Sequence, residues 1–494
     1  MIEHRGFRTL GELCEVRAGT HADRVAVRDD ASTLTYAELA ARARAVARLL
    51  GERGIVAGDR VAVQGPNRTA WVSAAYGVLM AGATVVPLGH RVPDAERQRL
   101  LAQLDPRLVL QDESVAPLPG AISFAELEAL PSEPAPLGLE WCDIATPALV
   151  LSSSGTSGTV KAVPMTHGQL LRVYDDVRVA LDATDDDVWL ATVPLTHSFG
   201  FNGILLVALL AGASVRLLPD YDPGRLTRLL REERITVLAG PPTIYHDLAG
   251  LDPGAAALNT RLGIVGSTEV SAPDIARLAE QLGIPRVVAG YGMTETSGTV
   301  ALGEVPSAPD GPLPWMVPLP GTEVRVCDEF DHPVAAGVRG RVQVRGHHVC
   351  RPYADAPDLR PGGWFDTGDL GELDDTGRLA VAGRVNDTII VSGFNVDPRE
   401  VEAVLREHSR VADAAVVGVH DPRSGQRLLA CVIPTGDPPR SADLAAHVRA
   451  RLTPYKVPGD YVVLDELPRT RTGKLSRAAL RQMVEERPVG TTCG

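Results

Sequence analysis

The sequence predicts an α/β protein with mostly parallel sheets covered by helices, followed by a small β-rich subdomain and an α+β segment. The 494 residues correspond to about three domains of ordinary size. Short aliphatic segments alternate with helical patterns as far as about residue 290, which favours parallel strands with helices on their faces. After about residue 315, short strands separated by Gly and Asp follow one another with little helix between them.

The elements of the N-terminal part alternate regularly between strand and helix. The first ones are a strand at 32–36, a helix over 37–50, a strand over 60–64, a helix over 68–82 and a strand over 83–87. Later segments with the same β-branched or aliphatic character are 211–218, 235–239, 262–265 and 287–289. Strands that alternate with helices of this length predict parallel pairing.

The C-terminal part has a different pattern. Its first short strands are expected at 324–327, 340–345, 371–374 and 379–383. From residue 388 the pattern becomes α+β, with a helix over 398–408, strands over 411–419 and 427–432, and a helix over 443–451. This change of texture indicates at least one further folding unit after the parallel sheets.

Composition and charge indicate a soluble globular enzyme. Hydrophobic residues make up 45% of the chain and charged residues 22%, which excludes a disordered or fibrous protein. Lys and Arg number 49 against 62 Asp and Glu, a net charge of −13. An excess of negative charge argues against nucleic acid or an anionic membrane as the main partner.

Cysteine spacing and hydropathy predict a cytoplasmic protein without a membrane span. The six cysteines are far apart and form no CxxC pair, so neither a disulfide framework nor a zinc site is expected. The N-terminus is charged where a signal peptide would be apolar. Residues 188–215 contain no Asp, Glu, Lys or Arg, as a membrane span would require. Pro194, His197 and Asn202 interrupt this segment, however, which favours a buried strand–loop–helix unit.

A Ser/Thr/Gly-rich segment at 151–161 has the composition of a phosphate-binding loop. It follows the apolar strand 147–151 and supplies closely spaced backbone N–H groups and hydroxyls, with Lys161 at its end. It lacks the Gly-Lys-Ser/Thr order of a Walker loop and the glycine spacing of a nucleophile elbow. The glycines at 290–292 do not complete a dinucleotide fingerprint, because Glu295 stands at its third glycine.

Taken together, the motifs of the chain resemble those of one family. In order they are SSGTSGTVK at 153–161, PLTH at 194–197, GYGMTE at 290–295, TGD at 367–369, GRVNDTIIVSG at 383–393 and PRTRTGK at 468–474. The chain is identified as a member of the adenylate-forming superfamily, in its acyl-CoA synthetase (AMP-dependent ligase) branch. The resemblance extends from about Leu34 to Arg477.

The resemblance implies a fold and a two-step reaction. The family's large N-terminal domain has two stacked, mostly parallel α/β sheets and a small β-barrel-like subdomain, and a small mobile α+β lid follows. We therefore expect an AMP-binding domain over 1–385 with its β-rich subdomain at about 316–385, a hinge at Asn386, and the lid over 387–494. A carboxylate attacks the α-phosphorus of Mg·ATP, and a thiol then displaces AMP from the acyl-adenylate.

The resemblance also assigns roles to individual residues. Thr294 is expected to contact the α-phosphate, Glu295 to ligate Mg²⁺, and Lys474 to reach the substrate carboxylate; His197 completes the catalytic set. Contacts to the β- and γ-phosphates fall on Ser153, Ser154, Gly155, Thr156, Ser157, Gly158, Thr159 and Lys161. The remaining nucleotide and thiol contacts fall on Ser267, Thr268, Gly290, Tyr291, Gly292, Met293, Asp369, Arg384 and Gly393.

The acid is expected to be an aryl, alicyclic or medium-chain carboxylic acid. Residues 193–218 contain no Asp or Glu to hold a substrate ammonium, so an α-amino acid is not expected. The predicted acyl-pocket wall is apolar with a few polar groups, and consists of Phe199, Phe201, Asn202, Gly203, Leu206, Gly240, Pro241, Ser267 and Ala289. CoA is the expected thiol, and the phosphopantetheine arm of a carrier protein is the second candidate.

Two other activities are alternatives. An enzyme limited to one half-reaction is suggested by Val160 and Ala162, which replace the Pro and Gly usual in the family beside the loop lysine. A catalytically inactive binding protein would be expected to have lost Glu295, Asp369 or Lys474, and all three are present. The sequence therefore favours an acid–thiol ligase that uses ATP, Mg²⁺ and CoA.

Overall fold

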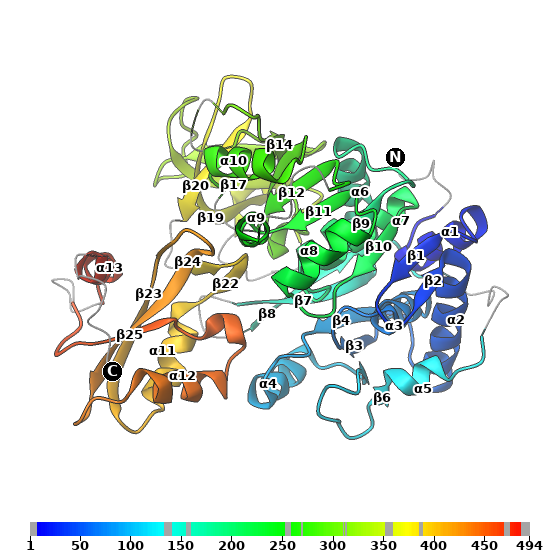
Figure 1. Ribbon diagram of the computed structural model, residues 1–494, viewed down its shortest axis with the longest axis horizontal. Helices are drawn as coiled ribbons and strands as arrows, with labels where there is room; N and C mark the ends of the chain where they lie inside the picture. The colour runs from blue at the N-terminus through cyan, green and yellow to red at the C-terminus, as the bar shows by residue number, and fades with distance from the viewer. Residues whose placement is uncertain are drawn as a thin grey trace.

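The structure is a computed structural model of the chain. It describes residues 7–132, 141–154, 160–251, 258–267, 270–309, 311, 314–350, 359–384, 389–468 and 475–485. Two large sheets, one antiparallel sheet and a separate C-terminal sheet make up its β structure. In Figure 1 the C-terminal sheet lies beside the rest of the molecule, with α13 (Arg477–Glu485) on its outer side.

The larger sheet has nine strands in the order β15-β14-β13-β12-β11-β9-β10-β1-β2. The six strands from β13 to β1 pair in parallel, and β2, β14 and β15 are antiparallel additions at the edges. The strand bounds are β1 (Val25–Arg28), β2 (Thr33–Thr35), β9 (Val188–Ala191), β10 (Ser214–Leu217), β11 (Val237–Gly240), β12 (Leu262–Gly266), β13 (Val287–Tyr291), β14 (Ala301–Glu304) and β15 (Val317–Pro318).

The second sheet has six strands in the order β6-β5-β3-β4-β7-β8. All its pairs are parallel except the β7–β8 hairpin. Its strands are β3 (Arg60–Gln64), β4 (Thr84–Leu88), β5 (Leu108–Gln111), β6 (Ile122–Ser123), β7 (Pro147–Ser154) and β8 (Val160–Thr166). The predicted α/β architecture with mostly parallel sheets is confirmed.

Helices join the two sheets through one hydrophobic core. Every residue of α3 is buried, as expected for a helix that is apolar on all sides, and its core includes Val61 of one sheet and Val215 of the other. The α2 helix begins with a capping box in which Thr35 and Glu38 satisfy each other's backbone N–H groups. The helices of this part are α1 (Leu10–Thr20), α2 (Tyr36–Glu52), α3 (Thr69–Met80), α4 (Asp94–Leu104), α5 (Phe124–Glu128), α6 (His167–Ala180), α7 (Val207–Ala211), α8 (Pro223–Glu232), α9 (Pro242–Gly250) and α10 (Ala272–Leu282).

The β-rich subdomain is a five-stranded antiparallel sheet. Its strands are β16 (Thr322–Cys327), β17 (Gly340–Gly346), β18 (Leu359–Arg360), β19 (Trp364–Leu373) and β20 (Leu379–Arg384). The TGD motif does not end a strand, as a turn would. It lies inside β19, with β17 and β20 paired on either side. The pairing of β17 with β19 is irregular at this point, where Gly368 has a φ of +73°.

The C-terminal sheet carries helices on both faces. Its strands are β21 (Ile389–Val391), β22 (Phe394–Val396), β23 (Val411–Asp421), β24 (Gly425–Pro434) and β25 (Asp460–Val463). Two helices, α11 (Pro398–Arg406) and α12 (Ser441–Arg449), share one apolar core with this sheet, and Leu480 of α13 belongs to a second core. The predicted hinge residue Asn386 lies outside the described residues.

Residues 188–215 form the expected buried unit. β9 is followed by a π-helical segment, Phe199–Leu206, then by α7 and β10. Within the described parts of the chain, no helix combines the length and apolar character that a membrane crossing requires. The missing charge of this segment therefore reflects burial in the core.

Candidate active site

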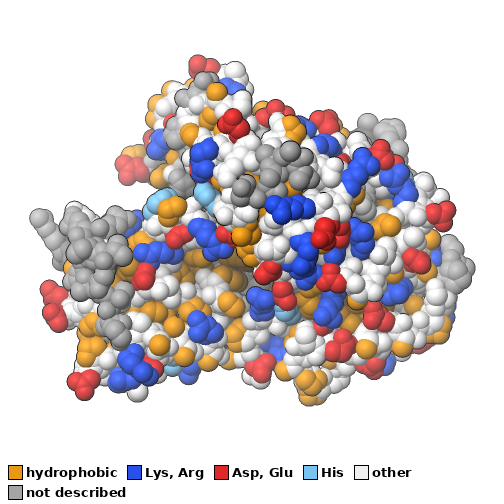
Figure 2. Space-filling model, in the orientation of Figure 1, with side chains coloured by type: hydrophobic (Ala, Val, Ile, Leu, Met, Phe, Trp, Pro, Cys, Tyr) orange, Lys and Arg blue, Asp and Glu red, His pale blue; other side chains and the backbone are white. Residues whose placement is uncertain are grey.

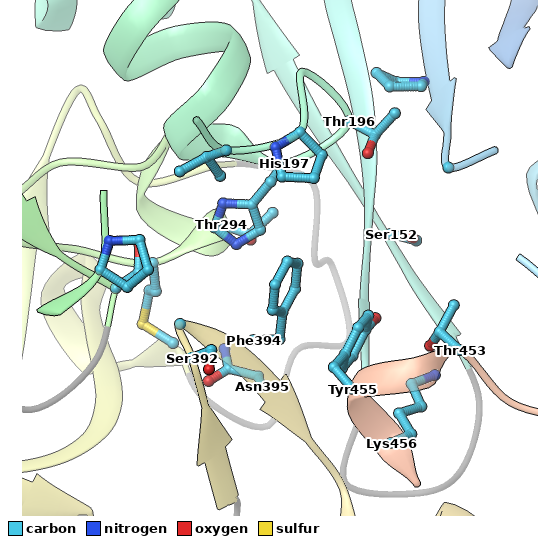
Figure 3. A pocket seen from close by; sticks show the side chains of 18 of the residues that line it. Ser152, Thr196, His197, Thr294, Ser392, Phe394, Asn395, Thr453, Tyr455 and Lys456 are labelled. Carbon is cyan, nitrogen blue, oxygen red and sulfur yellow. The ribbon is translucent and has the colours of Figure 1, made fainter. Parts of the chain in front are cut away.

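A cavity of about 700 Å³ lies where the parallel strands meet the C-terminal sheet (Figure 3). Carboxyl ends of parallel strands are where α/β proteins usually bind ligands. The cavity residues at or just after such strand ends are Gly65, Leu88, Thr192, Leu218, Pro241 and Ser267. From the C-terminal sheet and its loops come Ser392, Gly393, Phe394, Asn395, Thr453, Tyr455 and Lys456. Both parts of the chain therefore build one site.

The strands on either side of the phosphate-loop motif, β7 and β8, pair as an antiparallel hairpin. Ser153 on β7 is opposite Lys161 on β8, so the lysine is brought back to the loop's entrance. Lys161 and Ser152 both line the cavity. The loop itself, 155–159, and the side chains of Ser153 and Ser154 lie outside the described residues. The described strand residues next to the motif therefore reach the cavity.

The GYGMTE motif runs from the end of β13 into a single 3₁₀ turn, Thr294–Thr296. Met293, Thr294 and Glu295 all line the cavity, and Glu295 is half-buried. The Cys350 N–H donates a 2.9 Å hydrogen bond to the backbone oxygen of Glu295. The turn is thus held to the antiparallel subdomain and presents a hydroxyl and a carboxylate side by side.

Tyr291 and Asp369 meet beside this turn. The Tyr291 hydroxyl donates a 2.7 Å hydrogen bond to Oδ2 of Asp369. The Asp369 N–H donates to Oγ1 of Thr367 at 3.1 Å, and Asp369 is only 4% exposed. Arg384 pairs with Asp369 across the β19–β20 ladder, although its side chain is outside the described residues. A buried carboxylate is therefore assembled by two separate sheets.

The turn formed by Ser392, Gly393 and Phe394 comes within contact distance of the residue that follows β12 in the nine-stranded sheet. Gly393 has a φ of +89°, and a Cβ built on it would lie 2.9 Å from Cβ of Ser267. Only glycine adopts that backbone conformation readily and fits in that space. The chain therefore brings the C-terminal sheet to the rim of the cavity at Gly393.

Three rings follow one another along the cavity wall next to this turn (Figure 3). Phe394 stacks on Tyr455 with centroids 4.3 Å apart, and its other side meets His197 edge-on at 5.6 Å. Burial lowers the pKa of His197 to about 4, so its imidazole is neutral at neutral pH. Nδ1 of His197 accepts the Phe199 N–H at 3.2 Å, which leaves the proton on Nε2.

The His197 segment is fixed from behind by a buried asparagine. Asn67 accepts the Leu195 N–H at 2.8 Å and donates to the Val193 carbonyl at 3.0 Å. Asn67 is 5% exposed and lines the cavity. The backbone before His197 is therefore held at two points.

Most residues of the predicted acyl-pocket wall do not line the cavity. Phe201, Asn202 and Leu206 are fully buried, and Phe201 packs edge-on against Trp71 in the core. Apart from Asn202 the 199–206 segment is apolar, so its sequence does not show which side faces a ligand. Of the predicted wall only Pro241 and Ser267 line the cavity.

The predicted catalytic and binding residues fall into three groups. Those that line the cavity are Lys161, His197, Ser267, Met293, Thr294, Glu295 and Gly393. Those beside it but not among its lining residues are Gly290, Tyr291, Gly292 and Asp369. Those outside the described residues are Gly155, Thr156, Ser157, Gly158, Thr159, Thr268 and Lys474, and of Ser153, Ser154 and Arg384 only the backbone is described.

Several cavity residues were not predicted. Tyr455 and Lys456 follow a proline in a short 3₁₀ turn, Pro454–Lys456, and Glu96 stands in the first turn of α4. A buried charge such as Lys456 is unusual, but burial cannot be read from an isolated Tyr-Lys pair. No sequence signal would have joined residues 96 and 456.

Comparison with known proteins identifies the family. The model of AMP-binding enzymes matches residues 14–354, and that of the AMP-binding enzyme C-terminal domain matches 400–474. The chain is 34% identical over 489 residues to a feruloyl-CoA synthase from Amycolatopsis sp., covering 96% of this chain and 98% of the relative.

Solved structures agree with these matches. An o-succinylbenzoate CoA synthetase from Bacillus subtilis superposes with a TM-score of 0.84 at 26% identity, covering 95% of this chain and 98% of that one. A malonyl-CoA ligase bound to methylmalonyl-CoA and AMP gives 0.80 at 33% identity, covering 91% and 97%. The resemblance seen in the motifs and the expected enzyme class, an AMP-forming acid–thiol ligase, are confirmed. The chain belongs to the AMP-binding enzyme family.

Proposed function

We propose that the chain joins a carboxylic acid to CoA in two steps that share this cavity. In the first step the carboxylate oxygen attacks the α-phosphorus of ATP, pyrophosphate leaves, and an acyl-adenylate forms. In the second step the thiol sulfur attacks the acyl carbon, AMP leaves, and a thioester forms. The observation that carries the proposal is the single cavity lined by both the Lys161–Thr294–Glu295 group and the Gly393 turn.

The first step concentrates negative charge on the α-phosphate and on the leaving pyrophosphate. Cationic and hydrogen-bonding groups held in place beforehand stabilise such charge. We assign the β- and γ-phosphates to the β7–β8 loop with Lys161, the α-phosphate to Thr294, and the ribose hydroxyls to Asp369. The buried Asp369 carboxylate supports its assignment, because it can accept two hydrogen bonds.

Glu295 fits the proposed role of a Mg²⁺ ligand. Mg²⁺ prefers oxygen and commonly binds one or two carboxylates together with substrate phosphates. Among the described residues no group of three or more His, Cys, Asp and Glu side chains forms a ready-made metal site, which suits a metal that arrives with ATP. When bound, the ion would neutralise phosphate charge.

We also propose that residues 387–494 act as a lid that turns about Asn386 on the domain 1–385. The lid residues at the cavity are Ser392, Gly393, Phe394, Asn395, Asp397, Glu400, Arg423, Thr453, Pro454, Tyr455 and Lys456. Among the described residues, none of 475–485 lines the cavity, and Leu475 packs in the core that contains Leu480 of α13. The orientation described here suits the thiol step, and Lys474 would act after the lid has turned.

The acid is proposed to be aryl, alicyclic or of medium chain length. The cavity wall contains apolar groups such as Leu88, Val193 and Ile244 beside many polar and charged side chains. The apolar groups would contact the acid, and the polar ones would contact the nucleotide and the thiol. CoA is the proposed acceptor, and a carrier-protein arm is not favoured. Positive and negative side chains are interspersed on the face in Figure 2, which supports small molecules rather than nucleic acid as partners. The proposed location of the enzyme is the cytoplasm.

Pyrophosphate release with a panel of acids tests this function. The panel comprises ferulate, 2-succinylbenzoate, cyclohexanecarboxylate, octanoate and malonate, each with ATP and Mg²⁺, with and without CoA. We expect one apolar acid to give a single turnover without CoA and continuous turnover with CoA. A chain that releases no pyrophosphate with any acid, or that turns over continuously without any thiol, would contradict the proposal.

A further inference from the structure

A buried ion pair joins the large domain to the segment that carries Tyr455. Glu96, in the first turn of α4, accepts the backbone N–H of Thr453 at 2.9 Å through Oε2. Its other oxygen, Oε1, accepts a 2.6 Å hydrogen bond from Nζ of Lys456. One carboxylate therefore contacts both ends of the four-residue segment 453–456, more than 350 residues away in the sequence (357 and 360).

The pair is removed from solvent. The side chains of Glu96 and Lys456 are each 7% exposed. A second carboxylate, Glu400 of α11, lies 2.9 Å from Nζ of Lys456, and Arg99 approaches Glu400 at 3.6 Å. Burial by itself lowers the pKa of Lys456, but Tyr455 and the two carboxylates raise it above its ordinary value. Lys456 is therefore an ammonium held between charges from two domains.

The location of this pair connects it to the thiol side of the cavity. Tyr455 stands between Thr453 and Lys456, and its ring stacks on Phe394 next to the Gly393 turn (Figure 3). Because Glu96 holds both ends of the segment, it restrains the Tyr455 ring in its stacked position on Phe394. Glu400 belongs to the same domain as Lys456, so Glu96 supplies the part of the contact that depends on lid orientation.

A second inter-domain ion pair provides a comparison. Arg423 donates to both oxygens of Asp247 at 2.6 and 2.7 Å, and Tyr221 also donates to Asp247 at 2.7 Å. The Arg423 side chain is 60% exposed and that of Asp247 is 10% exposed, so water reaches this pair from the arginine side and screens it more than the Glu96–Lys456 pair. Breaking a buried pair costs much more, since one charge stays unpaired in the interior.

Building on the proposed function, we propose that Glu96 and Lys456 are positioning residues for the thiol-transfer step. By holding segment 453–456 to α4, they stabilise the present lid orientation and keep Tyr455 and Phe394 in place along the path of the incoming thiol. Neither residue is required in this role when the lid turns to form the acyl-adenylate. Loss of the pair should therefore separate the two half-reactions.

The test compares Glu96→Gln and Lys456→Met with the matched control Asp247→Asn, which alters the more solvent-accessible inter-domain pair. Single-turnover pyrophosphate release measures adenylation with the panel acid that reacts fastest. Rapid mixing of its purified acyl-adenylate with a CoA series measures the rate and apparent KM of the thiol step. We expect Glu96→Gln to lose about 10²-fold in the thiol step and to keep adenylation within about threefold, with Asp247→Asn near the parent in both.

Three further results separate positioning from general damage. The double variant Glu96→Gln/Lys456→Met should be no slower in thiol transfer than Glu96→Gln alone, because the pair acts as a unit. Lys456→Arg should recover part of the rate, since it restores the charge. Amide exchange over residues 450–457 should speed up in Glu96→Gln without change at residues 60–64.

Several outcomes would overturn the proposal. They are an unchanged thiol step in Glu96→Gln, equal losses in both half-reactions, additive losses in the double variant, and unchanged amide exchange over 450–457. If the parent chain releases no pyrophosphate with any acid, the proposed function fails instead. Amide exchange still tests the contact in that case, because it requires no substrate.

Discussion

The hydroxyl of Tyr291 donates a 2.7 Å hydrogen bond to Oδ2 of Asp369, 78 residues further along the chain. This bond links the last residue of β13 in the nine-stranded sheet to β19 in the antiparallel sheet. It restrains the Tyr291 ring and orients a buried carboxylate at the same time. The two residues proposed to hold the adenosine of ATP therefore support each other's positions.

The first prediction concerns this pair. Asp369→Asn should raise the KM for ATP about 10- to 100-fold, because hydrogen bonds to a charged group contribute about 1.5–3 kcal/mol. Tyr291→Phe keeps the ring and should raise KM less. Pyrophosphate release at a series of ATP concentrations measures both values. An Asp369→Asn variant with the parent's KM would show that the carboxylate does not contact the nucleotide.

The second prediction concerns the thiol path at Gly393. Gly393→Leu, and to a smaller extent Gly393→Ala, should abolish thioester formation while first-turnover pyrophosphate release survives, because a side chain there meets Ser267. Gly377→Ala is the control, since Gly377 has a similar φ of +81° but open space around its Cβ position. Equal loss of both half-reactions in Gly393→Leu would indicate misfolding instead.

The third prediction separates Lys474 from Glu295. Lys474→Ala should slow adenylation about 10²- to 10³-fold and still convert supplied acyl-adenylate and CoA to thioester at nearly the parent rate. Glu295→Gln should also slow adenylation, but its defect should depend on Mg²⁺ concentration. Magnesium titrations of both variants provide the measurement. Identical magnesium responses, or parent-like adenylation in Lys474→Ala, would refute these roles.

The fourth prediction concerns the proposed hinge. Proline fixes φ near −65°, so Asn386→Pro should hold the lid in one orientation and slow one half-reaction by about 10²-fold or more. Adenylation is the step expected to survive. Separate single-turnover assays of the two steps give the answer, and parent-like rates in both would exclude rotation at this residue.

The fifth prediction concerns stability in acid. Burial lowers the pKa of His167 from 6.5 to about 4, and its Nδ1 accepts the Leu10 N–H at 3.1 Å. Between these two pH values the unfolded chain binds more protons than the folded chain, so stability should fall as pH falls through this window. One such histidine contributes a slope of up to about 1.4 kcal/mol per pH unit.

Denaturant unfolding at pH 7, 6 and 5 measures this slope. His197, His347 and His348 have pKa values lowered in the same direction by burial, so the parent slope should exceed that of one group. His167→Gln keeps an acceptor for Leu10 and should reduce the slope. An identical slope in parent and variant would exclude His167 as a contributor.

Local patterns in the sequence were sufficient for the fold class and for part of the site. Alternating strands and helices predicted the parallel sheets because aliphatic segments buried on both faces have a recognisable length and composition. Adjacent residues such as Thr294 and Glu295 reach the cavity together, since they form a short turn soon after β13 ends at Tyr291. Proximity in the sequence accounts for these successes.

Only the tertiary structure decided which distant residues meet and which side of an apolar segment faces a ligand. Phe201, Asn202 and Leu206 were expected at the acyl pocket, yet their side chains are fully buried. Asp369 lies within a strand because β17 and β20 pair on either side of β19. The contact between Glu96 and Lys456 depends on the docking of two domains. Burial and long-range pairing are properties of the whole packed chain, so no local pattern encodes them.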